Sequence, residues 1–259
     1  MRMDVTDDAQ CQNHALTALS AVSAAPDAGQ GGPHYLPFHR PSINEEDLGA
    51  ARRALESGWL THGPVCQEFE AAFAAHVDAD RAVALSSGAA AMQLAFVALG
   101  VGDGDEVITT PLTFCSCAQV IEHVGATPVF ADVDSVTMQI DPAQIERALS
   151  PRTRAVIAVD YGGHPCRIEE IVKIANDHGL AVIEDAAHSV GAAVGDRMVG
   201  SIAHVTAFSF YATKNITTGE GGYRKGGNWA YEVLELGFKA NMTDFQAALG
   251  LSQLRREPS

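Results

Sequence analysis

The sequence has 259 residues, of which 47% are apolar and 19% charged, and its formal net charge is −15. This composition is typical of a globular chain with one large core, and no apolar run reaches the roughly 18 residues that a membrane-spanning helix needs. Because nucleic-acid-binding surfaces need clustered lysines and arginines, the acidic balance argues against nucleic acid as a partner.

The chain begins with a segment that shows no pattern of packed structure. Residues 1–34 are expected to form a flexible lead-in, since residues 21–34 are rich in Ala, Gly and Pro. The segment has no basic stretch followed by an apolar one, so a secretory signal is not predicted.

Two amphipathic helices are expected next. Asn44 can cap a helix that runs to about Ser57, where Gly58 ends it. A second helix is expected after Pro64. The apolar residues that share one face are Ile43, Leu48, Ala51 and Leu55 in the first helix, and Val65, Phe69, Phe73 and Val77 in the second.

From Arg81 onward, apolar runs of strand length alternate with helical stretches. Near-continuous Val, Ile and Ala strands separated by helices predict an α/β fold, with a mostly parallel sheet and helices on both faces. In such folds, ligands bind at the carboxyl ends of the strands. The predicted strands are 82–85, 106–109, 128–131, 155–159, 181–184 and 205–210, and the predicted helices between the first five are 89–99, 115–123, 142–149 and 168–178.

The five cysteines are odd in number and lack the paired spacing of a zinc site or a disulfide framework. We interpret them as reduced thiols of a cytoplasmic protein. Cys115 and Cys117 form a C-x-C pair, for which metal binding is the alternative to a role as small packing residues. No His/Cys cluster lies nearby in the sequence to complete four ligands, so no metal site is predicted.

The turn at residues 85–91 leaves a strand and opens a helix. Its backbone amides and the positive helix end can hold a phosphate, and Gly88 lets that phosphate approach the backbone closely. The alternative is an ordinary turn, since glycine and serine are common in turns. At the next strand end, Phe114 can stack on a planar cofactor or serve as a core phenylalanine.

The run at residues 209–222 places Lys214 between an apolar strand and a glycine-rich turn. Desolvation there would lower the pKa of the lysine, and a neutral amine can form a Schiff base with an aldehyde cofactor. The alternative is an exposed lysine in a loop. Upstream, an apolar strand ends at Asp185, and a pyridoxal phosphate (PLP) site needs both a lysine and an acid partner for the pyridine nitrogen.

These blocks together resemble the DegT/DnrJ/StrS family of PLP-dependent sugar aminotransferases. The resemblance extends from about residue 41 to about residue 256 and implies the large domain of a fold type I aminotransferase, normally a homodimer with active sites at the subunit interface. The blocks that carry it are Gly-Ala-Ala at 88–90, Pro-Leu-Thr-Phe at 111–114, Glu-Asp-Ala-Ala-His at 184–188, Ser-Phe at 209–210 followed by Lys214, Gly-Glu-Gly-Gly at 219–222, and the segment 235–250.

The resemblance also implies a role for each site residue. Lys214 would carry the cofactor as a Schiff base and move the proton between cofactor and substrate, and Asp185 would pair with the pyridinium nitrogen. Phe114 would stack on the ring, and His188 would lie beside it near the ring hydroxyl. The phosphate would be held by Gly88, Ala89 and Ser209, with Asn241 reaching across from the partner subunit.

The chain departs from the family pattern at several places. Ala89 stands where a hydroxyl residue is common, and Asp160 stands where a histidine is often found. The stretch between Gly222 and Tyr231 is shorter than the pattern, and the sequence stops at Ser259, where relatives continue into a smaller C-terminal domain. We therefore expect a PLP-binding large domain at 35–222, and a shortened connection with the start of a truncated C-terminal region at 223–259.

The resemblance implies an aminotransferase that converts a keto group of a nucleotide-linked sugar to an amine, with glutamate as donor, in aminosugar and polysaccharide biosynthesis. Amination of a keto-inositol is an alternative within the family. Deoxysugar dehydration is another, against which Lys214 counts, because relatives with that chemistry replace this lysine with histidine. The alternative from a different class is a noncatalytic or truncated PLP-fold protein, favoured by the missing C-terminal region.

Overall fold

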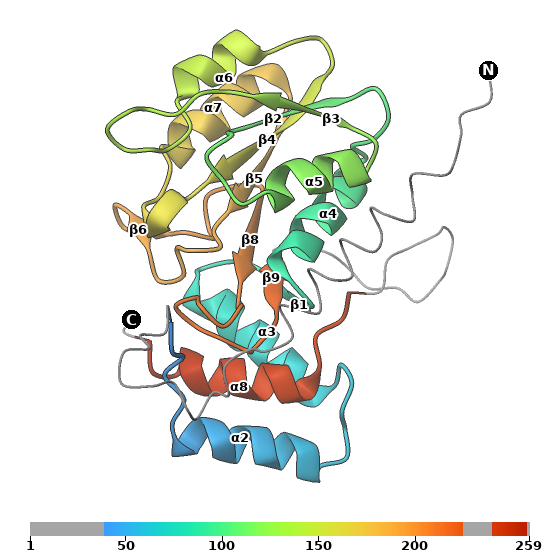
Figure 1. Cartoon of the computed structure of the whole chain (residues 1–259), viewed down its shortest axis with the longest axis vertical. Helices are drawn as coiled ribbons and strands as arrows, with labels where there is room; N and C mark the ends of the chain where they lie inside the picture. The colour runs from blue at the N-terminus through green and yellow to red at the C-terminus, as the bar shows by residue number, and fades with distance from the viewer. Residues whose placement is uncertain (1–38, 225–239, 258–259) are drawn as a thin grey trace, which may run out of the picture. The chain divides into compact units, whose positions relative to one another are not determined.

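A seven-stranded sheet forms the centre of the protein in a computed structural model, which describes residues 39–224 and 240–257 (Figure 1). Contacts within the chain separate residues 1–40 from residues 41–259, and the helices and strands of the described residues belong to the second unit. The lead-in predicted at 1–34 lies outside the described residues.

The sheet is mostly parallel, as predicted. Only β9 runs antiparallel to its neighbours, which are β1 and β8, while the other neighbouring pairs are parallel. In spatial order the strands are β1 (Val83–Leu85), β9 (Gly222–Arg224), β8 (Val205–Ser209), β5 (Ala181–Asp185), β4 (Thr153–Val159), β2 (Glu106–Thr109) and β3 (Thr127–Phe130).

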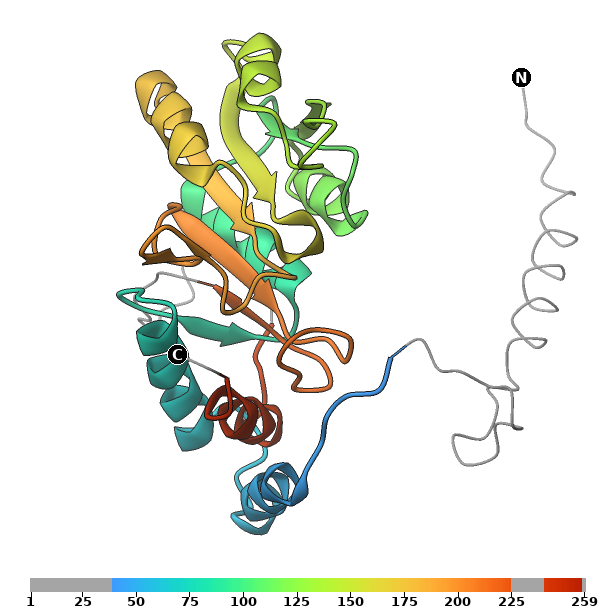
Figure 2. The ribbon, with the colours of Figure 1, turned by 90° about the vertical axis from the view of Figure 1, so that its left-hand side faces the viewer.

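Helices cover both faces of this sheet (Figures 1 and 2). On one face, side chains of α4 (Gly88–Leu99) and α5 (Ser116–His123) pack against strand residues such as Val107 and Ile157. On the other face, α6 (Pro142–Ala148) and α7 (Ile168–His178) pack against Ile108 and Val156. Residues 107 and 108 thus point to opposite faces, and burial of both faces explains why the strands are apolar throughout.

The six predicted strands and the predicted helices all form, with ends that differ by at most two residues; β2 and α7 match exactly the ranges 106–109 and 168–178. Their local signals are strong. In α7, the buried residues Ile168, Ile171 and Ala175 follow the helical period, and Gly179 ends the helix in the left-handed region at φ 67°. The short strand β9 and the hairpin β6 (Ala193–Val194) and β7 (Arg197–Met198) were not predicted.

The helix α3 (Pro64–His76) and the C-terminal helix α8 (Asp244–Leu254) pack together beside the β1 end of the sheet. The predicted stripe of α3 is confirmed as buried at Phe69, Phe73 and Val77, and Val65 is half-buried. Asp244 links the two helices, because its carboxylate accepts hydrogen bonds from three amides at the start of α3. These donors are Gly63 N at 2.7 Å, Val65 N at 3.1 Å and Cys66 N at 3.1 Å.

The helix α2 (Glu45–Glu56) begins at the predicted cap, where Asn44 and Asp47 form a reciprocal capping box. Its predicted apolar face is not the buried one, because Leu48 is 55% exposed and Leu55 is 54% exposed. Asp47 and Ala54 are buried instead, on the side that meets α8, which lies next to α2 in Figure 1. The small residue Ala54 allows close helix packing, and the leucines face outward.

Within the described part of the chain, no helix combines the length and the apolar character needed to cross a membrane.

Candidate functional site

A cavity of about 500 Å³ opens at the carboxyl end of the sheet, where β1, β4, β5 and β8 end. This is the place where a parallel sheet presents its ligand-binding loops. Seven of the eight residues predicted for the site line this cavity, namely Gly88, Ala89, Phe114, Asp185, His188, Ser209 and Lys214.

The turn after β1 forms one wall of the cavity. Ser87 caps α4 by accepting a hydrogen bond from Ala90 N at 3.0 Å, and the helix begins at Gly88. The amides of Gly88 and Ala89 belong to the first helical turn, which has no acceptor within its own helix, so they suit an anionic group. A Cβ atom at Gly88 would lie 3.1 Å from the carbonyl oxygen of Phe208, so glycine allows this turn to approach β8 and Ser209.

Asp185 is the last residue of β5 and is 7% exposed. Each of its carboxylate oxygens accepts one hydrogen bond. Oδ1 is 3.1 Å from the amide of Ala187, and Oδ2 is 3.1 Å from the thiol of Cys117. The carboxylate is therefore held in one orientation at the cavity.

Lys214 lies in the turn after β8, where its backbone amide donates to the carbonyl of Tyr211 at 2.9 Å. Its side chain is half-buried and lines the same cavity as Asp185. Partial burial lowers the pKa of Lys214 below its ordinary value, while the charge of Asp185 opposes this shift. Relative to a lysine in water, more of this amine is neutral and able to act as a nucleophile.

His188 and Phe114 lie at the rim of the cavity. Partial burial, together with the positive charge of Lys214, lowers the pKa of His188, so the imidazole is mostly neutral near pH 7. Phe114 is 75% exposed, which is a large apolar surface for a residue at a cavity mouth. Its ring is thus accessible to a planar ligand.

Asp160 is a cavity residue that the sequence marked only as a departure from the family pattern. It is 1% exposed, and its carboxylate accepts hydrogen bonds from Ser189 Oγ at 2.6 Å and Cys166 N at 2.9 Å. Burial raises the pKa of Asp160 to about 6, with the charge of Asp185 adding to the shift and the two hydrogen bonds opposing it. A buried carboxyl with a raised pKa therefore borders the cavity.

The sequence reasoning missed Cys117, which it interpreted as a packing residue. The structure confirms that Cys117 is fully buried but shows that its thiol contacts Asp185. Thr113, four residues earlier, lies at the cavity wall and contacts the same thiol. The spacing of these two residues on either side of a helix start was the available signal, but it does not identify the carboxylate that they reach.

Asn241, the eighth predicted residue, is not among the residues that line this cavity. It is exposed and pairs with Leu85 through an isolated β-bridge, and the preceding carbonyl of Ala240 accepts a hydrogen bond from Ser86 N at 2.7 Å. The segment at 240–241 thus supports the back of the turn that leads to Gly88.

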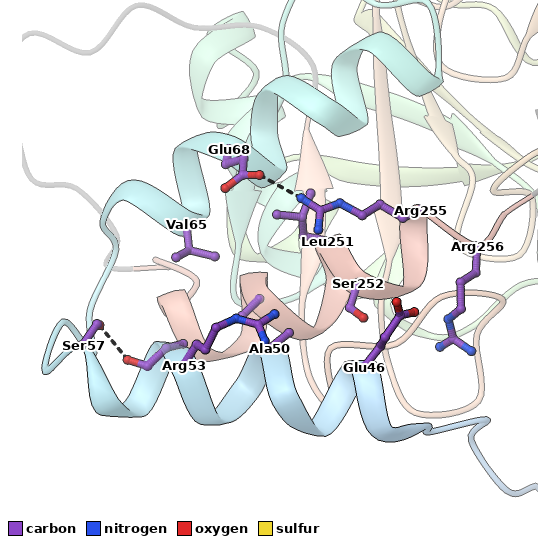
Figure 3. A pocket seen from close by; sticks show the side chains of 12 residues that line it. Glu46, Ala50, Arg53, Ser57, Val65, Glu68, Leu251, Ser252, Arg255 and Arg256 are labelled. Atoms are coloured by element: carbon purple, nitrogen blue, oxygen red, sulfur yellow. Dashed lines mark hydrogen bonds and ion pairs between the residues drawn. The ribbon is translucent and has the colours of Figure 1, made fainter.

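A second cavity, of about 430 Å³, lies between α2, α3 and α8, and none of the eight predicted site residues lines it (Figure 3). Two of the arginines on its wall are engaged by carboxylates, Arg255 by Glu68 at 3.0 Å and Arg256 by Asp47 at 2.6 Å. The cavity at the carboxyl end of the sheet is therefore the candidate site.

Comparison with known proteins agrees with this geometry. Residues 41–228 match the model of the DegT/DnrJ/EryC1/StrS aminotransferase family. The spore coat polysaccharide biosynthesis protein SpsC of Bacillus subtilis is 49% identical over 251 residues, a match that covers 86% of this chain and 64% of SpsC. The chain thus spans slightly less than two thirds of this relative.

Solved structures show the same fold. Spr1654 from Streptococcus pneumoniae, in its PLP form, is 32% identical with a TM-score of 0.81, over 86% of this chain and 67% of that one. The same protein has been solved in a PMP form. Helicobacter pylori PseC, an aminotransferase involved in the biosynthesis of pseudoaminic acid, is 29% identical with a TM-score of 0.78, over 85% of this chain and 65% of that one.

These matches confirm the predicted fold type I architecture, and they confirm PLP as the cofactor at the level of the family and its solved members. The matched region contains the turn after β1, Asp185 and Lys214, which the structure brings to one cavity. The chain belongs to the DegT/DnrJ/EryC1/StrS aminotransferase family.

Proposed function

We propose that this chain is the PLP-binding part of an aminotransferase that transfers an amino group, with glutamate as donor, to a keto group of a nucleotide-linked sugar. The observation that carries the proposal is the convergence of Lys214, Asp185 and the turn at Gly88 on one cavity. SpsC is named as a spore coat polysaccharide biosynthesis protein and PseC is involved in the biosynthesis of pseudoaminic acid, and both relatives favour a sugar as the substrate.

The residues of the cavity fit the cofactor part by part. The amides of Gly88 and Ala89, with the hydroxyl of Ser209, offer donors to a phosphate, and the exposed ring of Phe114 offers a flat apolar surface. Asp185 offers a fixed carboxylate to a ring nitrogen. When bound, PLP supplies an aldehyde that condenses with amines and a ring that accepts electrons.

Lys214 would then act twice through the same atom. As a neutral amine, Nζ would hold the cofactor, and when it is not bound to the cofactor, Nζ would take up and return a proton. The partial burial that lowers its pKa favours both tasks, since each needs an unprotonated nitrogen. His188, mostly neutral, would accept or donate a hydrogen bond at the ring hydroxyl without adding a charge.

Cofactor uptake by the chain tests this proposal. The purified protein should bind PLP with a visible absorbance band, and borohydride reduction should attach the cofactor mass irreversibly to the peptide that contains Lys214. The variant Lys214→Ala should lose both signals, whereas Lys173→Ala, which removes an exposed lysine of α7, should keep them. Attachment of the cofactor at another lysine would contradict the assignment.

A noncatalytic PLP-binding protein is the second candidate, because the cavity residues that would hold the cofactor do not by themselves require turnover. The two are separated by adding glutamate to the PLP-loaded protein. Conversion to pyridoxamine phosphate with release of 2-oxoglutarate supports the aminotransferase, and a spectrum that glutamate leaves unchanged supports the noncatalytic protein. A screen of keto sugars and keto-inositols as acceptors then identifies the substrate class.

The domain limits that we propose remain a PLP-binding large domain at 35–222, followed by a short connection and a C-terminal region.

We also propose that the chain acts as a homodimer in the cytoplasm. Outward-facing apolar side chains on and after α2, namely Leu48, Leu55, Trp59 and Leu60, supply a surface that association would bury. Asn241 is exposed, and the family resemblance implies that it contributes to the partner's site. Sedimentation at micromolar concentration should give twice the monomer mass, and a strict monomer that binds PLP normally would contradict this arrangement.

A further inference from the structure

The thiol of Cys117 lies between the cavity wall and the carboxylate of Asp185. Cys117 is in the first turn of α5 and is fully buried. Its sulfur is 3.1 Å from Asp185 Oδ2 and 3.0 Å from the hydroxyl oxygen of Thr113. Thr113 and Cys117 belong to the start of α5 and the loop before it, so the thiol joins this segment to a strand end 68 residues later.

The protons on the thiol, the carboxylate and the hydroxyl decide which group donates in each of the two hydrogen bonds. Burial, with the negative charge of Asp185, raises the pKa of Cys117 well above its ordinary value, so the sulfur keeps its proton. An ionised carboxylate can only accept, so the thiol donates to Asp185. The hydroxyl of Thr113 is then left to donate to the sulfur.

We propose that Cys117 is a positioning residue for Asp185, holding one carboxylate oxygen so that the acid meets the ring nitrogen of the cofactor in a single orientation. The inference depends on the proposed function, in which Asp185 is the acid partner of PLP. The amide of Ala187 holds the other oxygen at 3.1 Å, so rotation of the carboxylate would break two hydrogen bonds at once. A pre-oriented acid loses less conformational freedom when the cofactor binds.

A packing role and a positioning role predict different outcomes for two similar substitutions. Cys117→Ala and Cys117→Ser both reduce the volume of the side chain, but only serine keeps a donor. Losing one hydrogen bond to a charged acceptor should weaken PLP binding about tenfold in Cys117→Ala. Cys117→Ser should bind within about threefold of the natural protein, and so should the control Cys115→Ala, which changes the exposed cysteine two residues away.

The infrared S–H stretching band provides a readout that needs no cofactor. In the apo protein, the difference spectrum between the natural chain and Cys117→Ser should show a band at lower frequency than that of a free thiol, because hydrogen bonding to a carboxylate weakens the S–H bond. Asp185→Asn should move this band to higher frequency, since a neutral amide is a weaker acceptor.

The outcomes separate this inference from the proposed function. Equal weakening of PLP binding in Cys117→Ala and Cys117→Ser would overturn the positioning role. An S–H band whose frequency does not change in Asp185→Asn would also overturn it. If the natural chain binds no PLP, the proposed function fails, and the positioning role, which depends on it, fails as well. In that case the infrared band would still establish whether the contact exists.

Discussion

The substitution Asp160→Asn should change how the stability of the apo protein depends on pH. Asp160 is 1% exposed, and burial raises its pKa from 3.8 to about 6 in the folded chain. Between these pH values, the folded protein holds a proton that the unfolded chain has released, so the free energy of unfolding falls as the pH rises. A difference of about two pKa units corresponds to about 3 kcal/mol, lost in full above pH 6.

Asparagine has nearly the same shape but does not titrate in this range. It can accept a hydrogen bond from either Ser189 or Cys166 through one oxygen, so the substitution also costs about 1 kcal/mol at every pH. Asp160→Asn should therefore be less stable than the natural protein at pH 4 and more stable, by about 2 kcal/mol, at pH 7.5.

Urea unfolding of both proteins at the two pH values measures this change of sign. Ser189→Ala should steepen the pH dependence, because it removes a hydrogen bond that favours the charged form of Asp160. Asp80→Asn, at an exposed carboxylate, serves as the control for a simple loss of charge. A stability difference between Asp160→Asn and the natural chain that is the same at pH 4 and pH 7.5 would refute the reasoning.

Two further substitutions test the elements around the site. Asp244→Ala should destabilise the protein by about 3 to 5 kcal/mol in urea unfolding, because three amides at the start of α3 lose a charged acceptor. Asp244→Asn should give a loss of stability between zero and that of Asp244→Ala. A loss below about 1 kcal/mol in Asp244→Ala would contradict this linkage of α3 and α8. Gly88→Val should weaken PLP binding by about tenfold or more, because a Cβ only 3.1 Å from the Phe208 carbonyl pushes the turn away from β8. Gly88→Ala should have the smaller effect, and unchanged binding by both variants would show that this turn does not hold the phosphate.

The site residues could be placed at one sheet edge from the sequence alone. Asp185 and Ser209 end apolar strands, and Gly88 follows another. In a parallel sheet, all these strand ends meet at one edge, which is a consequence of topology and needs no knowledge of side-chain contacts. Lys214 follows the same rule, because the turn after β8 returns it to that edge.

Other features required the folded chain. The apolar period of α2 placed Leu48 and Leu55 on one face, but which face is buried depends on the partner helix, and α8 packs on the side of Ala54. The strand β9 has three residues and forms only because β1 and β8 offer hydrogen-bonding edges on both sides. Neither result follows from a local pattern.

The order and period of the main helices and strands follow from the sequence, and so does the sheet edge at which Lys214, Asp185 and the turn at Gly88 collect. The side-chain contacts at that edge, such as that of the Cys117 thiol with Asp185, and the burial of Asp160 depend on how the chain packs. These two kinds of feature differ in the separation along the chain of the residues that set them. Helix and strand periods are set by neighbours a few residues apart, whereas desolvation and hydrogen bonds across 68 residues, as between Cys117 and Asp185, depend on the packing of the whole chain.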